Sequence, residues 1–114
     1  MEKMMIVVQS GPDDVTRVMG GLRLAAAMLG MDWTPVVVFV DDGIECLRPG
    51  VIGDPVLGDY MKVAADLAGI YVLSESLEAR GTSVDDLDPG LDVTPVDLAW
   101  LADAAAEIGT TAAL

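Results

Sequence analysis

The chain has 114 residues, a length that predicts a single domain spanning residues 1–114. It carries 19 acidic and 6 basic residues, for a net charge of −13. A surface this negative repels phosphodiester backbones and anionic lipid headgroups, so we expect neither nucleic-acid binding nor a role at a membrane surface. Because the chain has no histidine and one cysteine, it has no internal disulfide, no histidine-based catalytic triad and none of the usual zinc sites.

The single cysteine and the high apolar content predict where the protein is located in the cell and whether it forms oligomers. The single cysteine, Cys46, fits a reducing cytoplasm, and no segment has the pattern of a signal peptide or the ~20 apolar residues of a membrane span. Hydrophobic residues make up 53% of the chain, which is high for so small a domain. We therefore expect a homo-oligomer with apolar subunit contacts. The alternative is a monomer whose core is rich in alanine and valine.

The first two thirds of the chain alternate between strand and helix patterns. Continuous apolar runs, typical of strands buried on both faces, occupy residues 4–9, 35–40 and 70–73. Amphipathic periodicity predicts helices over residues 15–29 and 55–68 and a short one over 44–47, and residues 48–54 form a loop. Asp13 or Asp14 caps the first of these helices, and Pro55 opens the second.

The last third has weaker signals. Ser74 is expected to cap a helical turn that ends at Arg80, and residues 82–90 form a polar excursion. Residues 91–93 are a candidate fourth strand. Thr94 as N-cap and Pro95 in the first turn predict a helix that runs to Ile108, and residues 110–114 are a plausible last strand.

Alternating strands and helices of these lengths predict an α/β fold. We expect a flavodoxin-like three-layer sandwich with a five-stranded, mainly parallel sheet and the strand order of flavodoxin-like sheets. In such sheets the loops beyond the carboxyl ends of the strands carry function. The loops in question are residues 10–14, 41–43 and 73–75.

These loops are acidic. The candidate binding edge consists of Asp13, Asp41, Asp42 and Ser74. Carboxylates at helix starts disfavour phosphate binding and serve most simply as caps, and no glycine-rich nucleotide motif occurs. We therefore expect no cofactor.

A receiver-like metal site is a weaker alternative. Asp13, Asp14 and either Asp41 or Asp42 would supply the oxygen ligands that Mg²⁺ prefers. Receiver domains also need an aspartate after the third strand and a lysine after the fifth, and this chain has neither. We therefore expect no resident metal.

Cys46 is the one candidate nucleophile. Its place near a helix start and beside Arg48 favours the thiolate, whereas the neighbouring carboxylates of Asp41, Asp42 and Glu45 raise the pKa of the thiol. A buried, inert cysteine is the simpler reading.

Several segments together resemble the DsrE/DsrF-like (TusC/TusD-type) sulfur-relay family. Residues 38–50 are similar to that family's strand, acidic-Gly turn and helix, and Asp59-Tyr60-Met61 is similar to the start of its third helix. Residues 76–81 resemble its "SLxxRG" ending, and Val93-Thr94-Pro95 resembles the start of its last helix.

The resemblance implies sulfur transfer through a cysteine persulfide, in trimeric or hexameric assemblies. In many members the persulfide cysteine stands at the turn after the third strand, where this chain has Leu73. The chain is thus expected to be a non-catalytic or scaffold subunit of an intracellular sulfur relay, acting as a homotrimer or homohexamer with other sulfur-relay proteins as possible partners. The alternative is a sulfur carrier or sulfurtransferase that uses Cys46.

Overall fold

The computed structural model describes residues 2–114 and contains a five-stranded sheet in which every neighbouring pair of strands is parallel. The predicted α/β class and parallel sheet are confirmed. The strands are β1 (Lys3–Val8), β2 (Thr34–Phe39), β3 (Ile70–Leu73), β4 (Thr94–Val96) and β5 (Thr111–Ala113).

Within residues 2–114, four α-helices and four 3₁₀ helices connect the strands. The α-helices are α1 (Val15–Gly30), α2 (Pro55–Leu67), α3 (Ser74–Ala79) and α4 (Leu98–Ile108). The 3₁₀ helices are η1 (Pro12–Asp14), η2 (Asp41–Leu47), η3 (Val84–Asp86) and η4 (Pro89–Leu91). The Asp14 side chain accepts a hydrogen bond from the amide of Arg17, which confirms the predicted cap of α1.

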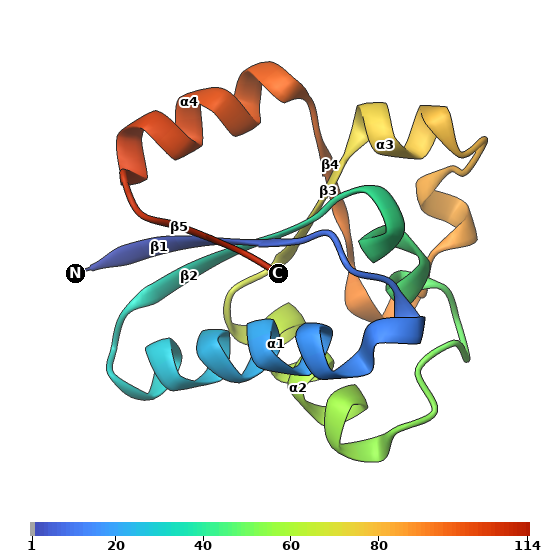
Figure 1. The fold of residues 1–114 in the computed structure, drawn as a ribbon, viewed down its shortest axis with the longest axis horizontal. Coiled ribbons are helices and arrows are strands. Elements are labelled where there is room, and N and C mark those ends of the chain that lie inside the picture. The colour runs from blue at the N-terminus through green and yellow to red at the C-terminus, as the bar shows by residue number, and fades with distance from the viewer. Residues whose placement is uncertain (1) are drawn as a thin grey trace.

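The two faces of the sheet are covered unequally. Figure 1 shows the sheet edge-on, with α1 and α2 below it and α4 and α3 above it. The larger core lies on the α1 and α2 side, where Phe39, Ile6 and Leu22 are almost fully buried. The smaller α4-side cluster has four buried residues: Val38, Val40, Leu73 and Val96. No side chain of α4 is fully buried.

The predicted strand order is wrong. Flavodoxin-like sheets have the order 2-1-3-4-5, whereas this sheet has the order β4-β3-β2-β1-β5. The steps from β1 to β4 all move in one direction across the sheet. Because such crossovers are right-handed, α1 and α2 lie on the same face. The return from β4 to β5 runs in the opposite direction and places α4 on the other face. Hydrophobic periodicity carries no information about the direction of each step.

The start of the last helix also differs from the prediction. Thr94 and Pro95 belong to β4, and the helix is capped by Asp97, whose carboxylate accepts a hydrogen bond from the amide of Trp100 at 2.8 Å. Proline is tolerated in β4 because this strand lies at the edge of the sheet. The candidate strand at residues 91–93 is replaced by the end of η4 and the turn that follows it.

Gly43 allows two strand ends to come together. A β-carbon at this position would lie 2.2 Å from the carbonyl oxygen of Val8 at the end of β1. A contact this short with backbone requires the chain to move. Glycine at position 43 therefore lets the turn after β2 pack against the end of β1.

We expect Gly43→Ala to lower the free energy of unfolding by about 1–3 kcal/mol, the usual effect of overpacking. Denaturant unfolding followed by circular dichroism measures the change. Gly58→Ala is the matched control, because a β-carbon there meets nothing within 4 Å inside α2. This control should gain up to about 1 kcal/mol from helix propensity. Equal stability of Gly43→Ala and wild type would contradict the argument.

Candidate functional site

The turn after β3 is formed as the sequence predicts, with strand passing directly into helix. Leu73 is the last residue of β3 and stands at the N-cap position of α3. Ser74 is the first residue of the helix and does not cap it, which corrects the expectation. The Leu73 side chain is 8% exposed and belongs to the α4-side cluster with Val38, Val40 and Val96. The leucine side chain is therefore held against the sheet and has little contact with solvent.

Cys46 lies in η2 and is 2% exposed. Its thiol donates a hydrogen bond to the carbonyl oxygen of Ser10, with an Sγ···O distance of 3.7 Å. Burial is the largest cause, and together with the carboxylates of Asp13 and Glu45 it raises the pKa of the Cys46 thiol from 9.0 to about 11. The predicted direction of the pKa shift is thus confirmed. Its first cause is burial, and Asp13 contributes although it lies on another loop.

Two arginines form a charged network beside Cys46 that the sequence analysis missed. The guanidinium of Arg80 pairs with the carboxylates of Asp42 and Glu45, and that of Arg48 pairs with Glu45 at 2.5 Å. Arg48 also donates to the hydroxyl of Thr82 at 2.8 Å. The bond from Arg48, with smaller contributions from Arg80, lowers the pKa of the Glu45 carboxyl. The network ties the turn after β2 to the segment after α3.

The structure gives Arg48 a different role from the one that the sequence predicts. The sequence places it next to Cys46, where a free guanidinium would stabilise the thiolate. In the structure its guanidinium binds Glu45 and Thr82. The ion pair with Glu45 is local, at a spacing of three residues, whereas the bond to Thr82 joins segments that are 34 residues apart.

The candidate edge residues are brought together only in part. Asp13 and Asp42 both lie against Gly11, since a β-carbon there would be 3.3 Å from the Asp13 carboxylate and 3.2 Å from the Asp42 carbonyl. Asp41 is held by Ser76, whose hydroxyl accepts from the Asp41 amide at 3.1 Å and donates to its carboxylate at 3.4 Å. Ser76, which is buried and was not among the predicted edge residues, therefore positions Asp41.

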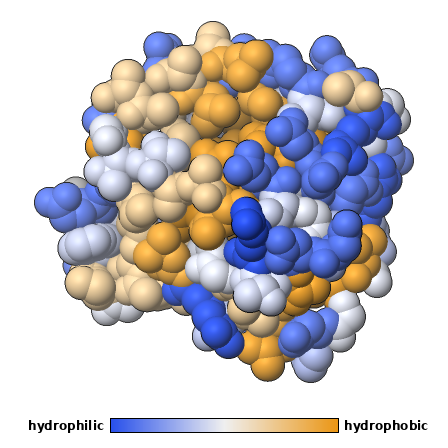
Figure 2. Space-filling model, in the orientation of Figure 1, coloured by the Kyte–Doolittle hydropathy of each residue, from blue (hydrophilic) through white to orange (hydrophobic). Residues whose placement is uncertain are grey.

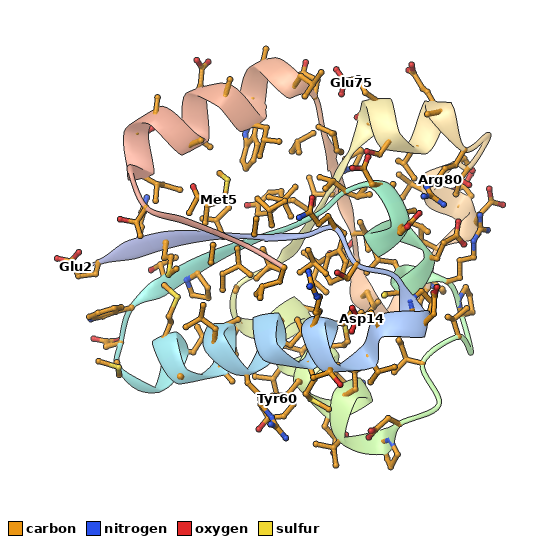
Figure 3. The ribbon with its side chains drawn as sticks, in the orientation of Figure 1. Glu2, Met5, Asp14, Tyr60, Glu75 and Arg80 are labelled. Atoms are coloured by element: carbon orange, nitrogen blue, oxygen red, sulfur yellow. The ribbon has the colours of Figure 1, made fainter. Side chains whose placement is uncertain are left out.

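Glu75 connects the two helices on the α4 side. Its carboxylate accepts a hydrogen bond of 3.1 Å from the amide of Leu98, the first residue of α4. Figure 3 shows Glu75 beside the starts of α3 and α4. The carboxylate thus satisfies an amide at the start of α4 as well as lying in the first turn of α3.

The edge does not assemble a metal centre. Among residues 2–114, no group of three or more carboxylate, thiol or imidazole side chains is placed to hold a metal ion. The strand order also differs from the 2-1-3-4-5 order of receiver domains. Beside Cys46 there is a small cavity of about 110 Å³, which Arg48, Met61 and Asp88 border.

The comparison with protein families decides the assignment. The sequence model of the DsrE/DsrF-like family matches residues 2–110. The chain belongs to the DsrE/DsrF-like family. The family suggested by the segments around residues 38–50 and 76–81 is thereby confirmed, and Leu73 stands at the strand-to-helix turn of this DsrE/DsrF-like domain.

Solved structures agree on the fold. The crystal structure of the ychN protein from E. coli is similar with a TM-score of 0.80 and 18% identity, and each chain is covered completely. The protein of unknown function MTH1491 from Methanobacterium thermoautotrophicum has a TM-score of 0.77 and 19% identity, again over the whole of both chains. No curated protein matches this DsrE/DsrF-like chain by sequence. At these identities the structural likeness establishes the fold alone.

The thiol of Cys46 should react slowly at neutral pH in the folded protein. A pKa of about 11 in place of 9.0 leaves about 100-fold less thiolate at pH 8. The rate of alkylation by iodoacetamide, followed by intact mass, should rise about tenfold per pH unit up to about pH 11. In denaturant the rate should level off near pH 9.

Cys46→Ser is the control and should show no alkylation at any pH. Circular dichroism at each pH confirms that the native samples remain folded. A native rate profile that levels off at pH 9 or below would show that the thiol is exposed and unperturbed.

Proposed function

We propose that this chain is a non-catalytic or scaffold subunit of an intracellular sulfur-relay system. The observation that carries the proposal is Leu73, which occupies the strand-to-helix turn where many DsrE/DsrF-like proteins carry the persulfide cysteine. A leucine side chain cannot hold sulfur. The Leu73 side chain is also 8% exposed and packs in the α4-side cluster, so it contributes to the fold of the turn.

The alternative, a sulfur carrier or sulfurtransferase using Cys46, has less physical support. Sulfur transfer requires a thiolate that can meet the thiol of a partner protein. Cys46 is 2% exposed, and burial together with Asp13 and Glu45 raises the pKa of its thiol to about 11. Both access and ionisation therefore oppose a role as persulfide carrier.

The partners in this proposal are other proteins of a sulfur relay and further copies of the chain. The loops at the carboxyl edge of the sheet carry exposed carboxylates at Asp13, Asp41 and Asp42, which disfavour tRNA and nucleotide phosphates. We place the protein in the cytoplasm, because its single cysteine is a free thiol. Among residues 2–114, no helix has the length and apolar character that a membrane crossing requires.

Assembly into a homotrimer or homohexamer is supported by an exposed stripe on α2. The inner side of this helix buries Leu57, Met61 and Ala64. Its outer side exposes Val56 at 51%, Val63 at 40% and Leu67 at 68%. Together with Tyr60, these residues have the spacing i, i+4, i+7 and i+11, which places them on one helical face.

Figure 3 shows Tyr60 on the side of the helical layer that faces away from the sheet. Val56, Val63 and Leu67 are exposed and the half-buried Tyr60 lies between them, so the stripe is a natural subunit contact.

Persulfide loading tests the main proposal. After incubation with a persulfide donor, the wild-type protein should show no added sulfur by intact mass, because its one thiol is buried. Leu73→Cys in the Cys46→Ser background should gain one sulfur, because the substitution places a thiol at the family's acceptor position. Stoichiometric loading of the wild type that disappears in Cys46→Ser would contradict the scaffold proposal and support the alternative of a sulfur carrier that uses Cys46.

The oligomer is tested by placing charge on the α2 stripe. Leu67→Asp combined with Val63→Asp should convert the assembly to monomers, measured by light scattering coupled to size exclusion. Leu98→Asp, an equally apolar and exposed position on α4, is the control and should leave the mass unchanged. Low salt should also weaken the wild-type assembly, because each subunit carries a charge of −13. A wild-type monomer at micromolar concentration in physiological salt would contradict the prediction.

A further inference from the structure

A groove lies on the α4 side of the sheet, where its residues Val36, Tyr71 and Trp100 pack against the α4-side cluster that contains Leu73. Its volume is about 300 Å³, at the lower end of the range for small-molecule pockets. One wall is the sheet, with Lys3, Val36 and Tyr71, and the other is α4, with Trp100, Asp103 and Glu107. The groove exists because, within residues 2–114, α4 is the one long helix on this face and buries none of its side chains completely.

Two aromatic rings form one end of the groove. Tyr71 and Trp100 stack with ring centroids 4.9 Å apart and an interplanar angle of 30°. Both side chains are half-buried, so part of each ring remains open to a ligand. In Figure 2 apolar residues gather over the part of the surface where α4 lies, and hydrophilic residues gather on the right, where α3 and the segment after it lie. Open aromatic faces attract organic cations through their negative π-surface.

Two carboxylates line the same groove. Asp103 and Glu107 are four residues apart on α4, so they lie one turn apart on one face, three and seven residues after Trp100. Neither forms an ion pair within 4.0 Å with any residue of the described chain 2–114. An aromatic pair beside two unpaired carboxylates is complementary to a positive charge with an apolar body.

We propose that this groove binds a small organic ammonium ion, whose nitrogen lies against the Tyr71–Trp100 pair and within reach of Asp103 and Glu107. The volume admits a compact ligand with a few methyl groups or one ring. Lys3 stands at the opposite wall and carries a like charge, which reduces the affinity for a cation. The proposed oligomer contact lies on α2, on the other face of the sheet, so it leaves the groove open.

The test uses choline as the probe and 3,3-dimethylbutan-1-ol as its uncharged isostere. The full chain is labelled with ¹⁵N, and the indole N–H resonance of Trp100 is followed during titration. Trp33→Phe assigns the two tryptophan resonances. Choline should shift the Trp100 resonance in a saturable way, with a dissociation constant in the millimolar range or below. The neutral isostere should bind about fivefold or more weakly, because it lacks the charge.

Charge substitutions distinguish choline binding in the groove from a general attraction of choline to an acidic protein. Asp103→Asn with Glu107→Gln should weaken choline binding about fivefold or more, and Lys3→Gln should strengthen it. Asp59→Asn with Asp66→Asn on α2 removes the same charge far from the groove and should change the affinity less than about twofold.

Four results would overturn the proposal. The first three are the absence of a saturable shift, equal binding of the neutral isostere, and equal weakening of choline binding by the α2 pair of substitutions. The fourth is a Trp100 resonance that shifts with protein concentration while choline no longer binds. The last would show that a second copy of the chain fills the groove. The spectrum of each variant reports directly whether it is folded.

Discussion

The parallel pairing of β1 with β2 is the constraint on which the rest of the structure depends. Six residue pairs join the two strands, from Lys3 with Thr34 to Val8 with Phe39, which is the longest register in the sheet. The end of this pair is closed by Gly43, whose missing side chain lets the turn after β2 contact the carbonyl of Val8. Because most of this pair is buried, each further strand and helix is positioned relative to it.

The direction of the crossovers then decides how the helices, and with them the apolar surface, are divided between the two faces of the sheet. Three successive steps in one direction place α1 and α2 together over the larger core, and leave the other face mainly to α4. A single helix of eleven residues cannot seal that face, and a groove with an aromatic end remains beside it. On the opposite side two long helices cover the larger core, and several apolar residues of α2 are exposed. The unequal layers thus produce two different surfaces: the groove on the α4 side, where we propose a small ligand, and the exposed stripe on α2, where we propose a subunit contact.

At the carboxyl edge of the sheet, packing and charge both reduce the reactivity of a thiol. Leu73 fills a place in the α4-side cluster, so the turn keeps its shape without a cysteine. Cys46 is near the same edge, yet its thiol is bonded to the Ser10 carbonyl and shielded from solvent. The network of Arg48 and Arg80 neutralises Glu45 and Asp42 and does not face the thiol as a free positive charge. An edge built in this way keeps the thiol of Cys46 away from solvent and in its protonated form.

The sequence by itself determined the fold class, most of the elements and the family, because continuous apolar runs and capped amphipathic stripes are local patterns. It also determined that Leu73 occupies the turn after β3, since that turn is a matter of a few adjacent residues. Only the tertiary structure decided the strand order, because the direction of a crossover depends on which strands pair over long range. The tertiary structure also decided the place of Pro95. Its sequence context predicts a helix start, and only the pairing of the edge strand β4 with β3 shows that Pro95 belongs to a strand. The pairing of Arg80 with Asp42, across 38 residues of chain, and the burial of Cys46 likewise depend on contacts between distant segments.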